Sequence, residues 1–155
     1  MSVDVGSKAP DFTLMDQDRK PVTLSAVVQH GPVLLAFFPA AFSSTCQSEL
    51  CTLRDSIATL GSEKAQVLGI STDTFFALKE FADQQQLNFP LLSDYNKDVI
   101  RTYDVVNPDM IGLKNIAKRA VFVIDHQGVV RHREVLDDAR NEPNYDTLRA
   151  ALASL

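Results

Sequence analysis

The chain has 155 residues and a formal net charge of −5, with 45% hydrophobic and 23% charged residues. This length predicts one globular domain over residues 1–155 with a core of its own. The acidic balance argues against nucleic acid as the main partner, and no apolar run approaches the roughly 18 residues that would span a membrane. The first residues lack the order of a secretory signal, so we expect a cytoplasmic protein whose cysteines are kept reduced.

The first half of the chain begins with two short alternating strands predicted in residues 11–24, around a polar turn at residues 18–20. Residues 33–38 are apolar at every position, which is typical of a strand covered on both faces. Residues 44–60 are predicted to form a helix.

The second half alternates further strands and helices. Such alternation, closed by a hairpin, predicts an α/β sandwich with a mixed central β-sheet flanked by helices. The expected elements are a strand at 65–72, a helix at 74–86 with Phe75, Leu78 and Ala82 on one side, a strand at 89–94, a short helix at 97–103, a hairpin at 120–136 turning at 126–128, and a helix at 144–155.

Both cysteines of the chain, Cys46 and Cys51, lie in the helix predicted at residues 44–60. Ser44, with Gln47 three residues later, resembles a capping box that would begin this helix. Cys46 would then share one face with apolar residues at helical spacing, namely Leu50, Leu53, Ile57 and Leu60.

Cys46 is therefore expected in the first helical turn, on the face turned toward the sheet. Free N–H groups and the positive end of the helix dipole stabilise an anion at this position. An ordinary cysteine, with a pKa of about 8.5, is only a few per cent thiolate at neutral pH, and the thiolate is the reactive form. The sequence thus places Cys46 where a reactive thiolate would be stabilised.

Cys51 lies about 140° around the same helix from Cys46, with the two Cα atoms roughly 8 to 9 Å apart. A disulfide needs a Cα separation below about 7 Å. The two cysteines therefore cannot bond while the helix is intact. Two interpretations stay open: the helix start unwinds during a reaction, or Cys51 is an ordinary helical residue.

The segment around Cys46 resembles the active-site signature of peroxiredoxins, in which a proline, a threonine or serine and a cysteine recur at the spacing of Pro39, Ser43 and Cys46. The likeness extends over nearly the whole chain and implies a thioredoxin-like sandwich with an N-terminal β-hairpin. The stretch "FFPAAFSSTCQSEL" is most similar to the AhpE-like branch, whereas a second cysteine five residues after the first is similar to the bacterioferritin-comigratory, or peroxiredoxin Q, branch. The other similar segments, in the same order as in the family, are "VGSKAPDFTL", "VLLAFFPAAF", "FPLLSD" and "KRAVFVID".

The resemblance implies a thiol-dependent peroxidase acting on hydrogen peroxide and organic hydroperoxides. Cys46 would attack the O–O bond and become a sulfenic acid. Arg119 would hold the thiolate and polarise the peroxide. The Ser43 hydroxyl would bond both sulfur and peroxide, and Pro39 would shape the turn and shield the sulfur. Glu49 would orient Arg119.

The resemblance also implies how the oxidised enzyme is recycled. Cys51 would resolve the sulfenic acid as an intramolecular disulfide, which a thioredoxin-type protein would reduce. AhpE-like members often lack this cysteine, so a one-cysteine mechanism with an external thiol is the alternative. No metal or organic cofactor is implied, and the chain would be a monomer or a homodimer.

Several features leave other interpretations open. Lys118 is the rival of Arg119 as the cation near Cys46. Ser43 stands where the family more often has threonine, and Asp104 where related sequences tend to have glycine. A thiol–disulfide oxidoreductase usually carries C-x-x-C, which the longer spacing here does not match. A redox sensor without turnover is the third class. The three histidines have no ligand spacing with the cysteines, so no metal site is expected.

Overall fold

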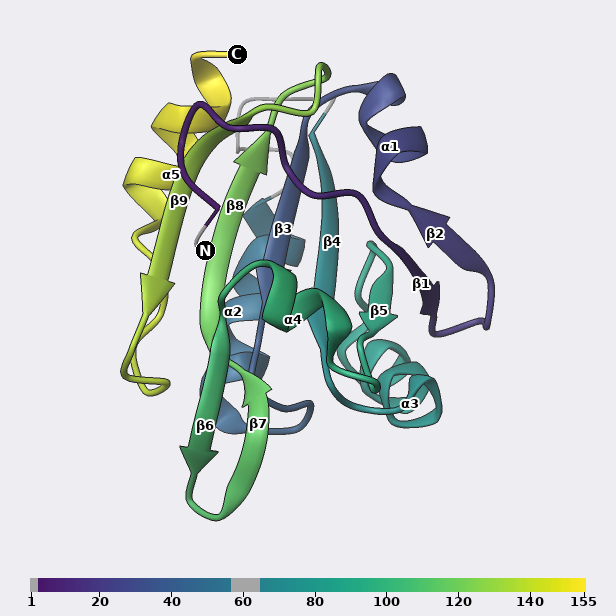
Figure 1. The fold of residues 1–155 in the computed structure, drawn as a ribbon. Coiled ribbons are helices and arrows are strands. Elements are labelled where there is room, and N and C mark those ends of the chain that lie inside the picture. Colours follow the sequence, from purple (N-terminus) through teal and green to yellow (C-terminus); the bar gives the residue numbers. More distant parts are fainter. Residues whose placement is uncertain (1–2, 57–64) are drawn as a thin grey trace.

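The computed structural model describes residues 3–56 and 65–155 (Figure 1). Predicted strands and helices are found in the predicted order, with additional short elements between them. In chain order they are β1 (Thr13–Asp16), β2 (Pro21–Thr23), α1 (Leu24–Val27), the 3₁₀ helix η1 (Val28–His30), β3 (Val33–Phe37), α2 (Ser44–Ser56), β4 (Gln66–Ser71), α3 (Phe75–Gln85), β5 (Leu91–Ser93), α4 (Asp98–Thr102), β6 (Val106–Met110), β7 (Leu113–Ala117), β8 (Arg119–Ile124), β9 (Val130–Leu136) and α5 (Tyr145–Ala153).

The main sheet has seven strands in the order β2-β1-β5-β4-β3-β8-β9. Strand β4 pairs in parallel with β3 and with β5, whereas β3–β8, β8–β9, β1–β2 and β1–β5 are antiparallel. The β1–β2 pair is the predicted N-terminal hairpin, and β8–β9 is the predicted late hairpin. The prediction of a mixed sheet in an α/β sandwich is confirmed.

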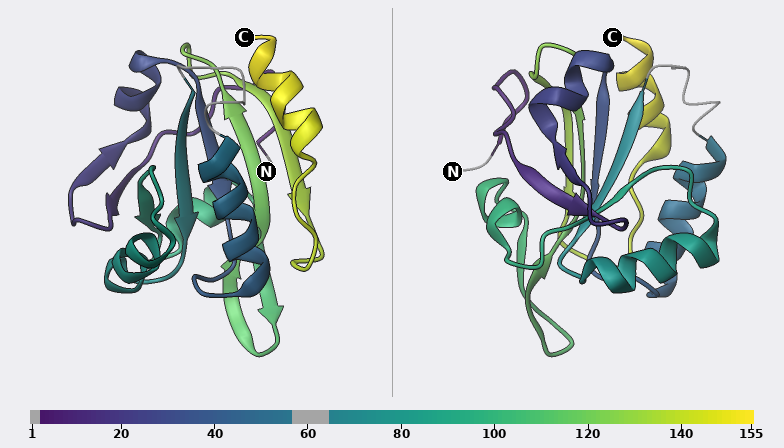
Figure 2. Two further views of the ribbon diagram at one scale, coloured as in Figure 1. Left: turned by 180° about the vertical axis from the view of Figure 1, so that it is seen from behind. Right: turned by 90° about the vertical axis from the view of Figure 1, so that its right-hand side faces the viewer.

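Strand β3 lies inside the sheet, between β4 and β8, and is fully buried. Alternate side chains enter two separate cores, as the two-residue period of a strand requires: Leu35 and Phe37 join one, and Leu34 and Ala36 the other. Helices α2, α3 and α5 cover the second face, and α4 lies on the first (Figure 2). Coverage of both faces explains why this strand has no polar position.

Helix α2 begins at Ser44, the predicted start. The Ser43 carbonyl accepts the first helical hydrogen bond, from the Gln47 N–H at 2.9 Å. The N-cap is therefore Ser43, with Cys46 at the third helical position, so the predicted capping box of Ser44 and Gln47 is wrong. The predicted apolar face is buried at Leu50 and Leu53, while Ile57 and Leu60 lie outside the described residues.

Strands β6 and β7 form a hairpin that the sequence pattern did not predict, extending beyond the end of the main sheet (Figure 1). Its tip is the Ile111–Gly112 pair, with φ angles of 48° and 93°. Positive φ at both positions is typical of the tightest hairpin turns, which favour asparagine and glycine and disfavour β-branched residues. Ile111 is 93% exposed.

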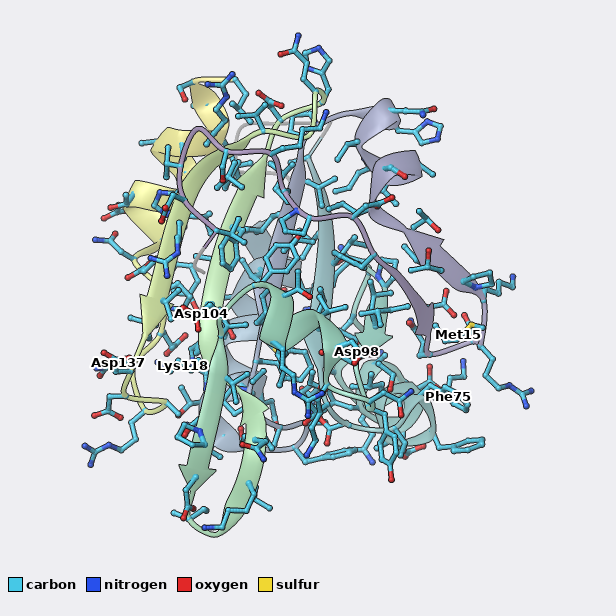
Figure 3. All side chains as sticks on the ribbon, viewed as in Figure 1. Met15, Phe75, Asp98, Asp104, Lys118 and Asp137 are labelled. Atoms are coloured by element: carbon cyan, nitrogen blue, oxygen red, sulfur yellow. The ribbon has the colours of Figure 1, made fainter. Side chains whose placement is uncertain are left out.

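Asp104, labelled in Figure 3, has a φ of 55° just after α4. This left-handed conformation favours glycine, and aspartate is among the other residues that adopt it most readily. The departure from glycine at this position is therefore a substitution that the backbone accommodates.

None of the helices in the described ranges is long and apolar enough to cross a membrane.

Candidate active site

The topology brings Cys46 and Arg119 together from distant parts of the sequence. Strand β3 leads into the loop before α2, and Arg119 is the first residue of β8, which pairs antiparallel with β3. Phe37, the last residue of β3, lies opposite Ala120. The end of β3 and the start of β8 therefore lie side by side at the same end of the sheet, beneath the first turn of α2.

The Arg119 guanidinium is the centre of the site. Its Nη2 donates to Cys46 Sγ at 3.2 Å and its Nη1 to Glu49 Oε1 at 2.8 Å. The Ala139 carbonyl accepts from Nη2 at 2.9 Å and from Nε at 3.3 Å. Arg119 is 1% exposed, and Cys46 and Glu49 are fully buried. The planar guanidinium is bonded to three partners and has little freedom to rotate, so its positive charge is fixed beside the sulfur.

The buried charges shift one another's ionisation. Burial works against the Arg119 charge, but Glu49 and Cys46 outweigh it and raise the pKa of the guanidinium above its ordinary value. Burial also raises the pKa of Glu49 to about 7, against the opposing effect of Arg119, and the carboxylates of Glu142 and Glu134 add to the rise. Arg119 therefore stays charged at neutral pH, whereas Glu49 is close to its midpoint.

A pocket of about 770 Å³ opens above this centre. Arg119 forms part of its wall, and Cys46 lies beneath it, one hydrogen bond from the Arg119 guanidinium. The pocket is bounded by the start of α2, the β6–β7 hairpin and the loop after β9. Its lining residues are Pro39, Ser43, Ser44, Thr45, Asn107, Asp109, Met110, Ile111, Arg119, Asp137, Asp138, Ala139 and Arg140.

Pro39 and Ser43, the other two signature residues, both line this pocket. Pro39 is buried and Ser43 is half-buried. Ser43 is the N-cap of α2 and also part of the pocket wall, three residues before Cys46 in the chain. Sequence reasoning placed both residues at the site, and the structure brings them there.

The loop before α2 is tied to the neighbouring strand. The Ala41 N–H donates to Asp73 Oδ2 at 2.8 Å, and the Ser71 hydroxyl donates to the same oxygen at 2.7 Å. Phe42 has a φ of 69°, and its ring packs on Phe81 with centroids 5.1 Å apart. A bulky residue in the left-handed region is strained, so the loop is held by its contacts and not by local preference.

Lys118, the rival cation, points away from the sulfur. Its Nζ donates to Asp137 Oδ1 at 3.0 Å, and the two side chains lie together at the outer edge of the sheet (Figure 3). Since the guanidinium of Arg119 contacts Cys46 directly, the geometry favours Arg119.

Cys51 lies on a different side of α2 from the site. It is half-buried, and its thiol donates to Gln85 Oε1 of α3 at 3.3 Å. Cys46 instead contacts Arg119 of β8. Both thiols are free, which agrees with the geometric expectation that an intact helix keeps them apart.

Sequence reasoning missed four residues that contribute to the site. The Ala139 carbonyl is a main-chain acceptor, which no residue type reveals. Asp73 directly follows the strand predicted at 65–72, and a polar residue at the end of a buried strand is the one feature of the sequence that could have indicated its place near the site. Met110 and Ile111 belong to the unpredicted hairpin.

Comparisons with known proteins agree with this geometry. The model of the AhpC/TSA family matches residues 5–133. Alkyl hydroperoxide reductase E of Mycobacterium tuberculosis is 39% identical over 135 residues, which cover 86% of each chain. Peroxiredoxin Q of Triticum aestivum chloroplasts is 38% identical over 130 residues, 84% of this chain and 58% of the relative. The crystal structure of the peroxidoxin BcpB from Mycobacterium tuberculosis superposes with a TM-score of 0.88 and 31% identity, covering 99% of this chain and 98% of that one. The chain therefore belongs to the AhpC/TSA family and is a peroxiredoxin, a thiol peroxidase with a thioredoxin-like fold.

Proposed function

We propose that Cys46 is the peroxidatic nucleophile for hydrogen peroxide and organic hydroperoxides. Its thiolate attacks one peroxide oxygen, the S–O bond forms, the O–O bond breaks, and the leaving oxygen departs as an alkoxide or hydroxide that takes up a proton. The observation that carries this proposal is the 3.2 Å contact between Arg119 Nη2 and Cys46 Sγ in the first turn of α2. A fixed cation at the positive end of a helix favours the thiolate.

The other site residues support the same step. Arg119 stabilises the charge that passes from sulfur to the leaving oxygen. The Ser43 hydroxyl can donate to one oxygen and accept from another in the pocket that it lines. Pro39 offers no N–H that would compete for these hydrogen bonds. Glu49 holds the guanidinium in place by accepting a hydrogen bond from Arg119 Nη1 at 2.8 Å.

The direct test is stopped-flow mixing of the reduced protein with one equivalent of hydrogen peroxide, followed by mass spectrometry. We expect rapid loss of peroxide and gain of one oxygen on Cys46, or a Cys46–Cys51 bridge. Slow reaction at the rate of an ordinary free thiol would overturn the proposal. Reduction of insulin disulfides by the same protein, without peroxide consumption, would favour a thiol–disulfide oxidoreductase.

We propose further that Cys51 resolves the sulfenic acid and that thioredoxin reduces the resulting disulfide. This step requires the first turn of α2 to unwind, because the two thiols face different elements. The strained Phe42 backbone just before the helix, with its φ of 69°, lowers the cost of leaving the folded loop conformation. We place this cycle in a reducing, cytoplasmic compartment, in a monomer or a homodimer.

Cys51→Ala should leave one fast oxidation intact and stop thioredoxin-dependent turnover, because no second thiol remains to form the disulfide. The measurement is NADPH consumption in a coupled thioredoxin assay, beside the single-turnover rate. Mass spectrometry should find sulfenic acid in the variant and a disulfide in the wild type. Undiminished turnover in the variant would instead establish resolution by an external thiol.

The β6–β7 hairpin supports activity on organic hydroperoxides, because Met110 and Ile111 give one wall of the pocket an apolar surface. A relative named alkyl hydroperoxide reductase E points the same way. An alkyl or aryl substituent on the peroxide would pack on these side chains while the O–O bond faces Arg119 and Cys46.

Ile111→Asn should lower kcat/KM for cumene hydroperoxide by roughly fivefold, or about 1 kcal/mol, and leave kcat/KM for hydrogen peroxide unchanged. Asparagine suits the φ of 48° at this position, so the turn should persist. Leu113→Asn is the matched control, since Leu113 is on the same hairpin and does not line the pocket. Equal losses for both peroxides would exclude a contact with the organic group.

A further inference from the structure

One buried cation serves two buried acids in this site. Arg119 contacts Cys46 Sγ at 3.2 Å and Glu49 Oε1 at 2.8 Å, and all three side chains are at most 1% exposed. If Cys46 and Glu49 were both ionised, the centre would carry an uncompensated negative charge. Burying such a charge is costly, so one of the two acids is expected to hold a proton.

The surroundings of Glu49 increase this cost. The groups that face it from the neighbouring elements are Arg119 of β8, Glu134 of β9, Glu142 in the loop before α5, and Tyr145, the first residue of α5. Glu142 accepts hydrogen bonds from Ser48 and Tyr145, and Glu134 accepts one from the Asn144 main-chain N–H. These donors are neutral and leave both negative charges in place. Arg119 is the one cation in the set.

The second carboxyl oxygen of Glu49 has no hydrogen bond. Oε2 is buried, and no donor among the described residues reaches it. An ionised carboxylate carries charge on both oxygens, and a bare buried oxygen is far more costly when charged than when neutral. The pKa of about 7 for Glu49 follows from the same burial.

We propose that Cys46 and Glu49 share one negative charge across Arg119. In the reduced protein the charge is on the Cys46 thiolate and Glu49 is neutral. When the sulfur is oxidised, Glu49 ionises and becomes the partner of Arg119. This inference rests on the proposed role of Cys46 as the nucleophile.

The proton balance of the peroxidase step follows from this exchange. The thiolate attacks, the S–O bond forms and the O–O bond breaks, which produces an alkoxide that needs one proton. Glu49 loses one proton as the charge on sulfur disappears. The sum is thiolate plus neutral carboxyl plus hydroperoxide giving sulfenic acid plus carboxylate plus alcohol, with no net proton drawn from solvent.

Glu49 is a positioning residue in this scheme, because it acts through Arg119. Glu49 Oε1 contacts the Arg119 guanidinium and not the peroxide. The proton that Glu49 releases therefore does not pass directly to the alkoxide, which takes up its proton by exchange with solvent. The exchange keeps Arg119 paired before and after oxidation, and the guanidinium is never left as an isolated buried cation.

The test is the proton uptake during one turnover, measured with an indicator dye in weakly buffered solution slightly below neutral pH. Wild type and Glu49→Gln are compared, each carrying Cys51→Ala so that the product stops at the sulfenic acid. Because Glu49, with its pKa of about 7, is protonated in only part of the parent molecules at this pH, we expect Glu49→Gln to take up roughly half to one more proton per Cys46 than the parent. The difference should shrink well above pH 7, where Glu49, with its pKa of about 7, is ionised in both redox states. Glu80→Gln, an exposed carboxyl on α3, is the matched control and should behave as the parent.

Equal proton uptake in Glu49→Gln and its parent would overturn the shared charge while leaving the peroxidase intact. Failure of the parent to consume peroxide would instead remove the proposed function and this inference together. If Glu49→Gln does not fold, the infrared difference spectrum of the parent decides. Oxidation should remove a neutral carboxyl band and produce a carboxylate band, and unchanged carboxyl bands would refute the exchange.

Discussion

Cys46→Ser should abolish the reduction of both hydrogen peroxide and organic hydroperoxides. A serine hydroxyl at this position stays protonated at neutral pH, and an alcohol does not attack the O–O bond as a thiolate does. The side chain is nearly the same size, and it can still accept a hydrogen bond from Arg119, so the fold should persist. The measurement is the second-order rate of peroxide loss by stopped flow, with circular dichroism to verify folding.

Cys51→Ser is the matched control for this substitution. It removes the other thiol of the same helix, which contacts Gln85 and not Arg119. We expect it to keep the first oxidation at the wild-type rate. If Cys46→Ser retained peroxide reduction and Cys51→Ser lost it, the assignment of the nucleophile would be reversed.

The layers of the fold could be predicted because they depend on local patterns. A strand that is apolar at every position must be covered on both faces, and β3 is. The face of α2 that carries Cys46 could be predicted for the same reason, since helical period alone places Cys46 with Leu50 and Leu53. The separation of Cys46 from Cys51 likewise followed from helix geometry.

The surroundings of Cys46 could be predicted only through family resemblance. Nothing local to Arg119 distinguishes it from Lys118, which precedes it in the chain. The difference arises because β8 pairs with β3 in the register that sets Ala120 opposite Phe37. This register turns Arg119 toward Cys46, while Lys118 meets Asp137. Strand register depends on residues far apart in the chain and cannot be predicted from local patterns in a single sequence.

The β6–β7 hairpin escaped prediction because its sequence breaks the usual rules. Pro108 lies within β6, although proline lacks the N–H that a strand ladder uses. Ile111 occupies a turn position where asparagine or glycine is expected. Both departures lie in the hairpin that borders the pocket, and departures from local sequence rules are expected most often near functional sites.

Arg119→Lys should lower the rate of peroxide reduction by about 10²–10³-fold, the loss typical when a fixed donor to a developing negative charge is removed. Lysine keeps the charge but has one nitrogen, which cannot reach Cys46, Glu49 and the Ala139 carbonyl together. A smaller share of Cys46 should therefore be thiolate at neutral pH. Stopped-flow rates and the pH dependence of iodoacetamide alkylation measure the two effects.

Lys118→Ala is the matched control for Arg119→Lys, and it should leave the peroxidase rate unchanged because Lys118 contacts Asp137 at the outer edge of the sheet.

Arg119→Ala is less informative by itself. It leaves Glu49 buried without its cation, which we expect to cost about 3–5 kcal/mol of folding free energy at pH values where Glu49 is ionised. The cost is smaller where Glu49 is protonated, and because Arg119 lowers the pKa of Glu49, its removal moves that boundary above pH 7. The double variant Arg119→Met/Glu49→Gln removes both charges and should regain most of that stability. If it also regained the wild-type peroxidase rate, Arg119 would act only in folding; continued loss of activity in a stable double variant assigns it to the reaction.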